Sequence, residues 1–177
     1  MAGLYTNIED SLFELAFSNG SPIQQRHIGE LMKELRFRRS QLLKSFAGRM
    51  KESEACWWGD DMPGAELMEE RILAQRMAGK CKAHFTHLLG DIGQRLQDAV
   101  GDAAPTQLPI SPEQLSYHFL MSCRSMSFEK YSLEVISDLF ARFVLDRLGT
   151  VYGGINLSLE QAGYRNTEQL ENMSATA

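Results

Sequence analysis

Two long stretches of this chain repeat apolar residues every three or four positions, and neither stretch has an internal proline. The first covers residues 22 to about 52, where Ser21 and Pro22 supply an N-cap and a proline at the first helical position. Its apolar stripe consists of Ile28, Leu31, Leu35, Leu42, Phe46 and Met50. The second covers residues 65–100, with a stripe of Leu73, Met77, Cys81, Phe85, Leu89, Ile92, Leu96 and Val100. This period predicts two amphipathic helices that are longer than a compact globule of this size, so the fold must be elongated.

Three further segments are predicted to be helical. A short amphipathic helix is expected over residues 8–18, and another begins at Ser111 and Pro112 and ends near residues 125–127. Residues 132 to about 162 carry the widest apolar stripe, which predicts one long central helix that ends at Gly163. No stretch shows the alternation that is typical of a strand.

These elements predict an all-α fold, an elongated antiparallel bundle of about five helices with two or three long helices. We expect the second and third helices to form a long hairpin that packs against the fourth and fifth. Residues 1–163 are expected to form a single helical-bundle domain. Residues 164–177 are polar and lack periodicity, so a loose polar tail is expected there.

Composition limits the classes of protein that remain. The chain has 177 residues, a net charge of −5 and 44% hydrophobic residues, which suits one globular domain. Its longest uncharged stretch, residues 148–159, is shorter than the ~20 residues of a membrane-spanning helix, so no span is expected. The N-terminus lacks the basic start of a secretory signal, and Cys56, Cys81 and Cys123 show no paired spacing. A cytoplasmic protein with reduced thiols is expected.

Sequence motifs of common enzymes are missing. The chain contains no Gly-x-Ser-x-Gly, no Gly-x-Gly-x-x-Gly and no Glu-x-x-His, and its Gly79-Lys80 pair lies inside a predicted helix. We therefore predict a protein that is not an enzyme and that uses no cofactor.

A weak metal-binding pattern lies on the second long helix. Cys81, His84 and His87, followed by Asp91, are spaced so that adjacent members are neighbours on a helix surface. A cysteine on an apolar stripe is more often a small core residue, so the favoured interpretation is structural and no metal is predicted.

A basic segment lies in the first long helix, where Arg38 and Arg39 interrupt the apolar stripe. Its members are Lys33, Arg36, Arg38, Arg39, Lys44, Arg49 and Lys51. The favoured interpretation is an ion pair at the core edge between Arg38 or Arg39 and an acid of the last helix, the candidates being Glu134, Asp138 and Asp146, rather than a binding role for the three arginines Arg36, Arg38 and Arg39. The alternative is that the three arginines bind an anionic ligand or partner. Nucleic acid is not expected, because the chain is acidic and the segment lacks interleaved aromatic residues.

Trp57 and Trp58 lie in the turn-rich connection between the two long helices. They either close the end of the core or form a partner-binding anchor, since Trp is enriched in interface hot spots. The wide apolar stripes and nine methionines also favour association, either as a homodimer or with a protein partner.

Several segments resemble an uncharacterised bacterial family, catalogued as domain of unknown function number 1631. The similarity spans residues 8–163, and the matching positions are residues 10–16, 34–39 and 111–115 with Phe119, together with Leu139, Phe140, Val144, Leu145, Leu148, Gly149, Tyr152, Asn156, Leu159, Ala162 and Gly163. Some larger members of the family resemble cyclic-diguanylate signalling proteins in carrying a PilZ domain. This chain lacks the Arg-x-x-x-Arg motif of that domain.

Together these observations favour a non-enzymatic helical protein-interaction or regulatory module of a bacterial cytosolic signalling system. Its partner would be another protein or a second copy of the chain. The alternative is a receptor for a phosphate-bearing small ligand, such as a cyclic dinucleotide, bound by Arg36, Arg38 and Arg39.

Overall fold

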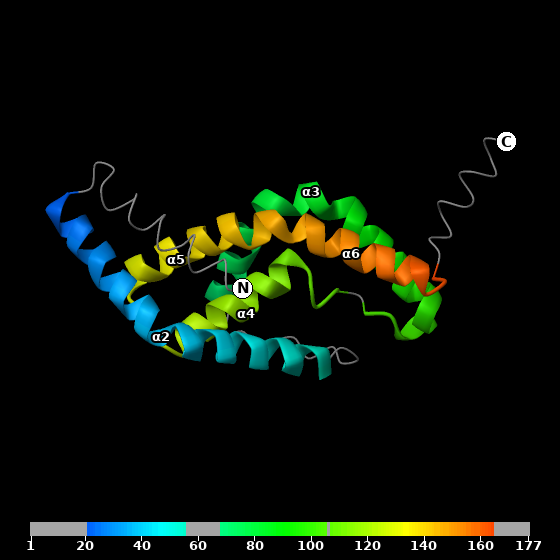
Figure 1. Ribbon diagram of the computed structural model, residues 1–177, viewed down its shortest axis with the longest axis horizontal. Helices are drawn as coiled ribbons and strands as arrows, with labels where there is room; N and C mark the ends of the chain where they lie inside the picture. Colours follow the sequence, from blue (N-terminus) through cyan, green and yellow to red (C-terminus); the bar gives the residue numbers. More distant parts are fainter. Residues whose placement is uncertain (1–20, 56–67, 106, 165–177) are drawn as a thin grey trace.

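The computed structural model describes residues 21–55, 68–105 and 107–164. All regular structure in these ranges is helical, which confirms the all-α prediction (Figure 1). The α-helices are α2 (Pro22–Ala55), α3 (Met68–Val100), α4 (Pro112–Arg124), α5 (Lys130–Phe143) and α6 (Leu148–Gln161), with 3₁₀ turns η2 (Gly101–Ala103) and η3 (Leu145–Arg147). The helix predicted over residues 8–18 lies outside the described residues. None of the described helices is long and apolar enough to cross a membrane.

The start and end of α4 follow the sequence prediction. Ser111 is the N-cap, its hydroxyl accepts a 3.3 Å hydrogen bond from the Gln114 amide, and Pro112 occupies the first turn. The helix is followed by Ser127, whose φ of 54° is a left-handed conformation that stops helical propagation. The chain then reverses into α5.

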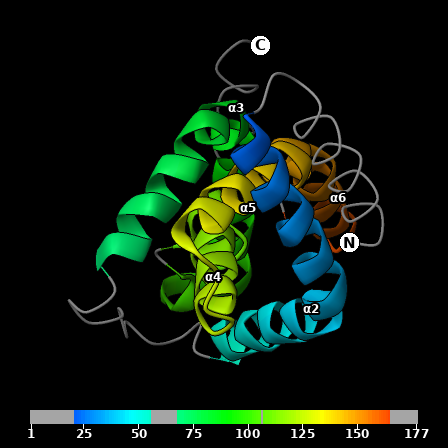
Figure 2. The same ribbon diagram turned by 90° about the vertical axis from the view of Figure 1, so that its left-hand side faces the viewer.

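The helices pack differently from the predicted hairpin. α2 packs on α4 and α5, whereas α3 packs mainly on α4 and α6 and also contacts α5. Figures 1 and 2 show α2 and α3 apart, with α4 between them. The hairpin prediction was therefore wrong, because the apolar stripes of both long helices are covered by shorter helices rather than by each other. The body is elongated, as predicted (Figure 1).

The last predicted helix is also corrected, because it is two helices. α5 ends at Phe143, its C-cap residue Val144 has φ −113° and ψ −61°, and η3 separates it from α6. The break buries both Leu145, which is 0% exposed, and Leu148. The wide stripe in the sequence thus comes from two helices with different buried faces, and only α2 and α3 are long among the described helices.

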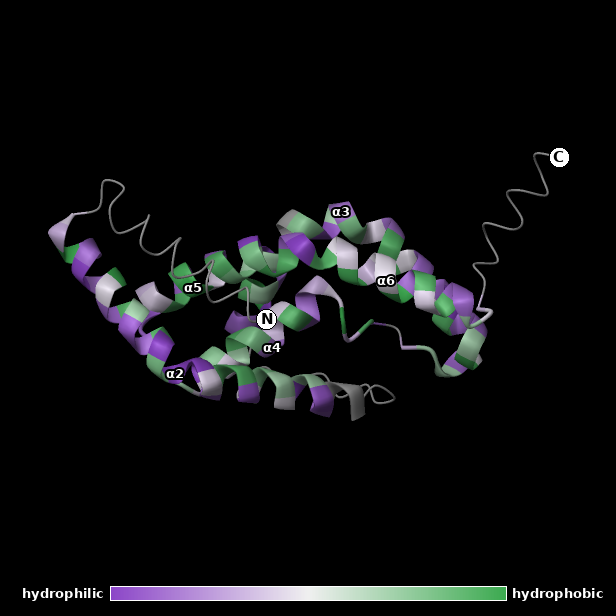
Figure 3. Cartoon of the chain, viewed as in Figure 1, coloured by the Kyte–Doolittle hydropathy of each residue, from purple (hydrophilic) through white to green (hydrophobic). Residues whose placement is uncertain are grey.

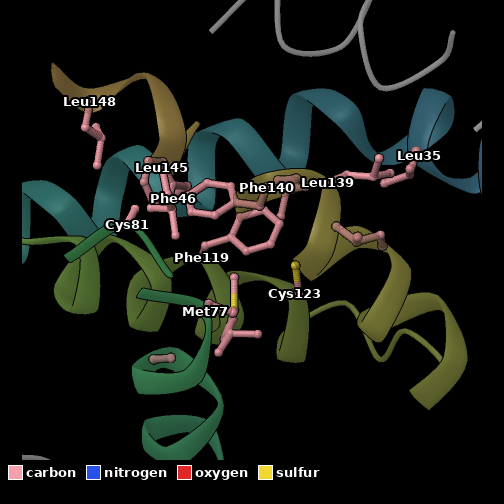
Figure 4. Packing of buried hydrophobic residues seen from close by; sticks show 14 of the residues in the cluster. Leu35, Phe46, Met77, Cys81, Phe119, Cys123, Leu139, Phe140, Leu145 and Leu148 are labelled. Atoms are coloured by element: carbon pink, nitrogen blue, oxygen red, sulfur yellow. The ribbon is translucent and has the colours of Figure 1, made fainter. Parts of the chain in front are cut away.

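Aromatic side chains join the helices in the core. The rings of Phe119 and Phe140 stack with centroids 4.0 Å apart, and Phe46 meets Phe140 edge-on at 6.1 Å (Figure 4). These contacts connect α4, α5 and α2. Edge-to-face and offset contacts of this kind add about 0.5–1.5 kcal/mol each to the burial of the rings.

A second set of contacts holds α6 against α3. The ring of Phe85 meets that of Tyr152 edge-on at 5.5 Å, and the Tyr152 hydroxyl donates a 2.7 Å hydrogen bond to the Ile110 carbonyl. The Asn156 amide donates to the Leu88 carbonyl at 2.9 Å. Gly149 allows the close approach, since a Cβ there would lie 3.0 Å from the Phe85 ring. These contacts fix which face of α6 is buried and which is exposed.

The end of α6 follows the sequence prediction. Gly163 has φ +94°, and the amides of Gly163 and Tyr164 donate to the carbonyls of Glu160 and Leu159, the pattern of a Schellman motif. The buried Arg95 of α3 donates a 2.6 Å hydrogen bond to the Tyr164 carbonyl. The rest of the predicted polar tail, residues 165–177, lies outside the described residues.

Candidate functional site

Arg38 stands at the middle of α2, where Figure 1 shows the helix bending around the turn between α4 and α5. Its guanidinium forms a 3.2 Å ion pair with Glu34, donates to the Met126 carbonyl, and lies 5.7 Å from the centre of the Phe128 ring. The predicted ion pair with an acid of the last helix, Glu134, Asp138 or Asp146, is therefore wrong for Arg38. The Met126 carbonyl, in the turn between α4 and α5, occupies the position where we expected a carboxylate of the last helix.

Arg36 and Arg39 lie on a different face of α2 from Arg38, because residues three apart are neighbours on a helix whereas residues one or two apart are not. Both side chains are exposed, and both have further interactions. The structure thus separates Arg38 from the other two arginines. Anion binding by the exposed pair remains a prediction.

The residues of the weak metal pattern point in different directions. Cys81 is buried on α3, and its thiol donates to the Ala78 carbonyl at 3.3 Å, whereas His84 and His87 are exposed. Burial raises the pKa of Cys81 to about 11, which favours the thiol over the metal-binding thiolate. Within the described ranges no three His, Cys, Asp or Glu side chains gather as a metal site would require.

The predicted partner-binding anchor, Trp57 and Trp58, lies outside the described residues.

A group of basic side chains that sequence reasoning missed lies beside α4, between α2 and α3. We call it the Arg49 cluster, and it consists of Arg49 of α2, Arg71 of α3, and Tyr117, His118 and Arg124 of α4. Burial raises the pKa of Tyr117, while the positive charges of Arg49, Arg71 and Arg124 lower it and Glu70 raises it. Arg49 also lowers the pKa of His118, after burial, the larger cause. No spacing rule could have found this cluster, since its members come from three separate helices.

Hydrogen bonding in the Arg49 cluster is incomplete. Arg124 is paired with Glu70. Arg49 Nε and His118 Nε2 are shielded from solvent and have no hydrogen-bond partner among the described residues. Leaving such an atom without a partner costs about 1–3 kcal/mol, so a ligand that accepts hydrogen bonds would recover part of this cost.

An apolar face of α6 is partly exposed, although its Ile155 and Leu159 also pack against the core. It lines an open depression of about 640 Å³, and its residues are Thr150, Val151, Gly154, Ile155, Ser158 and Leu159. Val151 is 52% exposed. The helix has Glu160 as its single charged residue, and Figure 3 shows hydrophobic residues along its length. We call these six residues the α6 face.

Comparison with protein families gives one result that bears on these sites. The N-terminal domain of a protein of unknown function, DUF1631, matches residues 64–163, more than half of the chain. This match confirms the resemblance drawn from the sequence. It includes α3 to α6, and therefore the α6 face and all of the Arg49 cluster except Arg49 itself. No curated protein and no solved structure matches the chain.

Proposed function

The chain belongs to the DUF1631 N-terminal domain family, and we propose that it is a non-enzymatic helical interaction module that binds a second copy of itself through the α6 face. Because the family has no known function, support for the proposal comes from the α6 face. Burying an exposed apolar surface is the main favourable free energy in protein association.

The order of residues in the α6 face suits antiparallel packing of α6 against its own copy. If two copies cross between Gly154 and Ile155, Val151 lies opposite Ser158 of the partner subunit, and Gly154 lies opposite Ile155 of the partner subunit. Thr150 then lies opposite Leu159 of the partner subunit. Each pair joins a larger apolar side chain to a smaller residue, the arrangement by which side chains of one helix enter gaps on another. A two-fold interface requires such self-complementarity, and this observation carries the proposal.

Space and charge support the same arrangement. A Cβ built on Gly154 would meet nothing within 4 Å, so the surface above this glycine is open to a partner. Arg147 precedes the first residue of α6 and is exposed. In an antiparallel pair it lies near the partner's α6 C-terminus, which carries the negative end of the helix dipole.

The size of the face sets the expected affinity. α6 has 14 residues and is therefore about 21 Å long. One helix face of this length and about 10 Å width is smaller than the roughly 800 Å² per partner of a standard stable interface. We therefore expect a reversible dimer that dissociates at micromolar concentrations.

Sedimentation of the full chain over a range of concentrations tests the dimer. Val151→Glu places a charge in the α6 face and should leave a monomer. Leu157→Glu is the matched control, because Leu157 is 55% exposed on α6 but lies off the face. The wild type and the control should both dimerise. A wild type that stays monomeric at all concentrations, or an equal loss of dimer in both variants, would overturn the proposal.

Disulfide cross-linking tests the register of the helices. In a Cys56→Ser background, a mixture of Val151→Cys and Ser158→Cys chains should form a cross-linked heterodimer on mild oxidation. Each variant alone should cross-link poorly, because its cysteine lies several residues from its copy in the antiparallel register. Cross-linking of each variant with itself would instead indicate parallel helices.

The proposal also covers the cellular location of the protein and its role there. We propose that the module acts in the bacterial cytoplasm within a regulatory system, a setting suggested by its resemblance to an uncharacterised bacterial family. Cys81 and Cys123, the free cysteines among the described residues, are both buried, which suits a protein that does not rely on disulfides.

A further inference from the structure

Helix α2 carries an excess of positive charge that the self-association of α6 does not use. It contains eight arginines and lysines and four glutamates, although the whole chain has a net charge of −5. Between Lys33 and Lys51 there are seven basic residues and one acid, Glu34. The excess therefore lies in the middle and the second half of the helix.

Four residues of this segment lie in one line along α2. Lys33, Phe37, Lys44 and Lys51 are spaced by four, seven and seven positions. Because an α-helix has 3.6 residues per turn, these spacings are close to one and two whole turns, and the side chains share one side. All four residues are exposed. We call them the outer face of α2.

The outer face lies opposite the buried side of the helix. The buried residues of α2 are Ile28, Leu31, Leu35, Leu42 and Phe46. Figures 1 and 2 show α2 at the edge of the body, with α4 and α5 on its inner side. Arg38 donates to the Met126 carbonyl in the turn between α4 and α5, whereas Phe37 beside it is 90% exposed. Phe37 therefore lies on the convex side of α2, near its bend.

The lysines of the outer face are available to a partner. Among the described residues, none of the three has a carboxylate within ion-pair distance. Glu34, which is one turn from Phe37, is held in a 3.2 Å ion pair by Arg38. Glu52 follows Lys51 but lies about 100° around the helix, and its charge acts on His118 of α4. The outer face is therefore positively charged along its length.

We propose that the outer face of α2 binds the surface of an anionic lipid bilayer, with the Phe37 ring among the headgroups and the lysines beside the lipid phosphates. Each lysine near such a surface raises the affinity about fivefold. Its long side chain reaches the headgroups while the helix stays at the surface, and the aromatic ring supplies the apolar part of the contact. This binding needs no membrane-spanning helix.

A protein partner suits the outer face less well than a lipid surface does. Protein interfaces have an apolar core of several residues inside a polar rim. Phe37 has polar neighbours along its side of the helix, namely Lys33, Ser40 and Gln41. A fluid lipid surface adapts to a convex helix and accepts a single ring among lysines.

Co-sedimentation of the full chain with lipid vesicles tests the proposal. One set of vesicles is pure phosphatidylcholine, and the other contains roughly one third phosphatidylglycerol, an anionic lipid. At about 0.1 M salt we expect binding to the anionic vesicles to be at least about tenfold stronger than binding to the neutral ones. Most of this binding should be lost at about 0.5 M salt, because salt screens exposed charges.

A double lysine variant locates the electrostatic part of the binding. Lys33→Gln with Lys44→Gln should weaken binding to the anionic vesicles at least about tenfold, since two charges of the outer face are lost. Arg76→Gln with Lys130→Gln is the matched control, because it removes the same charge from exposed positions on α3 and α5. The control should keep most of the wild-type binding.

A Phe37 variant locates the apolar part. Phe37→Ser should weaken binding to the anionic vesicles and leave its salt dependence unchanged, since the ring carries no charge. Ile72→Ser is the matched control, because Ile72 is 59% exposed on α3. Both side chains are exposed, so circular dichroism should show the same helix content in the two variants and the wild type.

The possible results separate a lipid partner from other partners. Equal binding to both kinds of vesicle, binding to neither, or equal weakening in the test and control variants would overturn the proposal. Binding to soluble polyglutamate without binding to anionic vesicles would assign the outer face to an acidic protein, and would also overturn it. The Val151→Glu variant should still bind anionic vesicles, because Val151 lies on α6. Failure of the dimer and failure of lipid binding are therefore distinguishable.

Discussion

Arg38 illustrates how much a single side chain contributes to the arrangement of the helices. Its partners are a carboxylate on its own helix, Glu34, and the carbonyl of Met126, which lies 88 residues away in the chain. The sequence predicted that this arginine would be paired at the core edge, and the structure confirms the pairing but not the partner. Sequence spacing reports which residues share a helix face, whereas a turn carbonyl has no sequence signature.

Buried thiols predict how stability depends on pH. Burial raises the pKa of Cys81 to about 11 and that of Cys123 to about 12, from the ordinary thiol value of 9.0. Above pH 9 the unfolded chain therefore loses protons that the folded chain keeps. Stability is fully present below pH 9 and falls as pH rises toward the folded pKa values, by up to about 1.4 kcal/mol per pH unit for each thiol.

Urea unfolding at several pH values between 8 and about 10.5 checks this prediction. Cys81→Ala should be less stable at neutral pH, because the core loses contacts, but its stability should fall less steeply above pH 9. An unchanged slope in this variant would show that Cys81 ionises equally in the folded and unfolded chains.

At the scale of the helices, ends were easier to predict than contacts. The Ser111 cap and the Gly163 stop depend on local chemistry, and both are confirmed. The break near Val144 was missed because apolar residues continue through it, and periodicity cannot distinguish one wide stripe from two narrow ones. The placement of α4 between α2 and α3 was missed because a stripe shows that a face is buried without showing which helix covers it.

Sequence spacing does not show which helices come together, and this explains why the candidate sites were predicted only in part. Arg36, Arg38 and Arg39 were grouped because they are neighbours in the sequence, yet Arg38 lies on a separate face of α2. The Arg49 cluster joins residues from three helices, and its members became neighbours only through tertiary packing. Charge segregation of this kind is a property of the fold and not of any sequence window.

Gly153 within α6 and Gly163 just beyond its end predict opposite effects of the same substitution. Gly163→Ala should lower the free energy of unfolding by about 1 kcal/mol, because φ +94° is unfavourable for alanine. Gly153→Ala should raise it by about 0.5–1 kcal/mol, since the new methyl group meets nothing within 4 Å and alanine favours the helix. Thermal unfolding of both variants beside the wild type provides the measurement. Destabilisation by Gly153→Ala would indicate that a neighbouring surface already occupies the space above α6.

At the scale of the whole molecule, the division of packing predicts the shape in solution. α2 is held by α4 and α5, and α6 is held by α3, so the two long helices extend the body in place of folding back on each other. A compact chain of 177 residues would have a radius of gyration of about 16 Å. Small-angle scattering below the concentration at which the wild type dimerises should give a larger radius of gyration, with the pair-distance distribution of an elongated particle.

The Val151→Glu variant should give the same scattering curve at every concentration, because the substitution removes the dimer without changing the packing of α2 or α3. A compact value for that variant would mean that α2 folds against α3 in solution, which would restore the hairpin that the structure replaces.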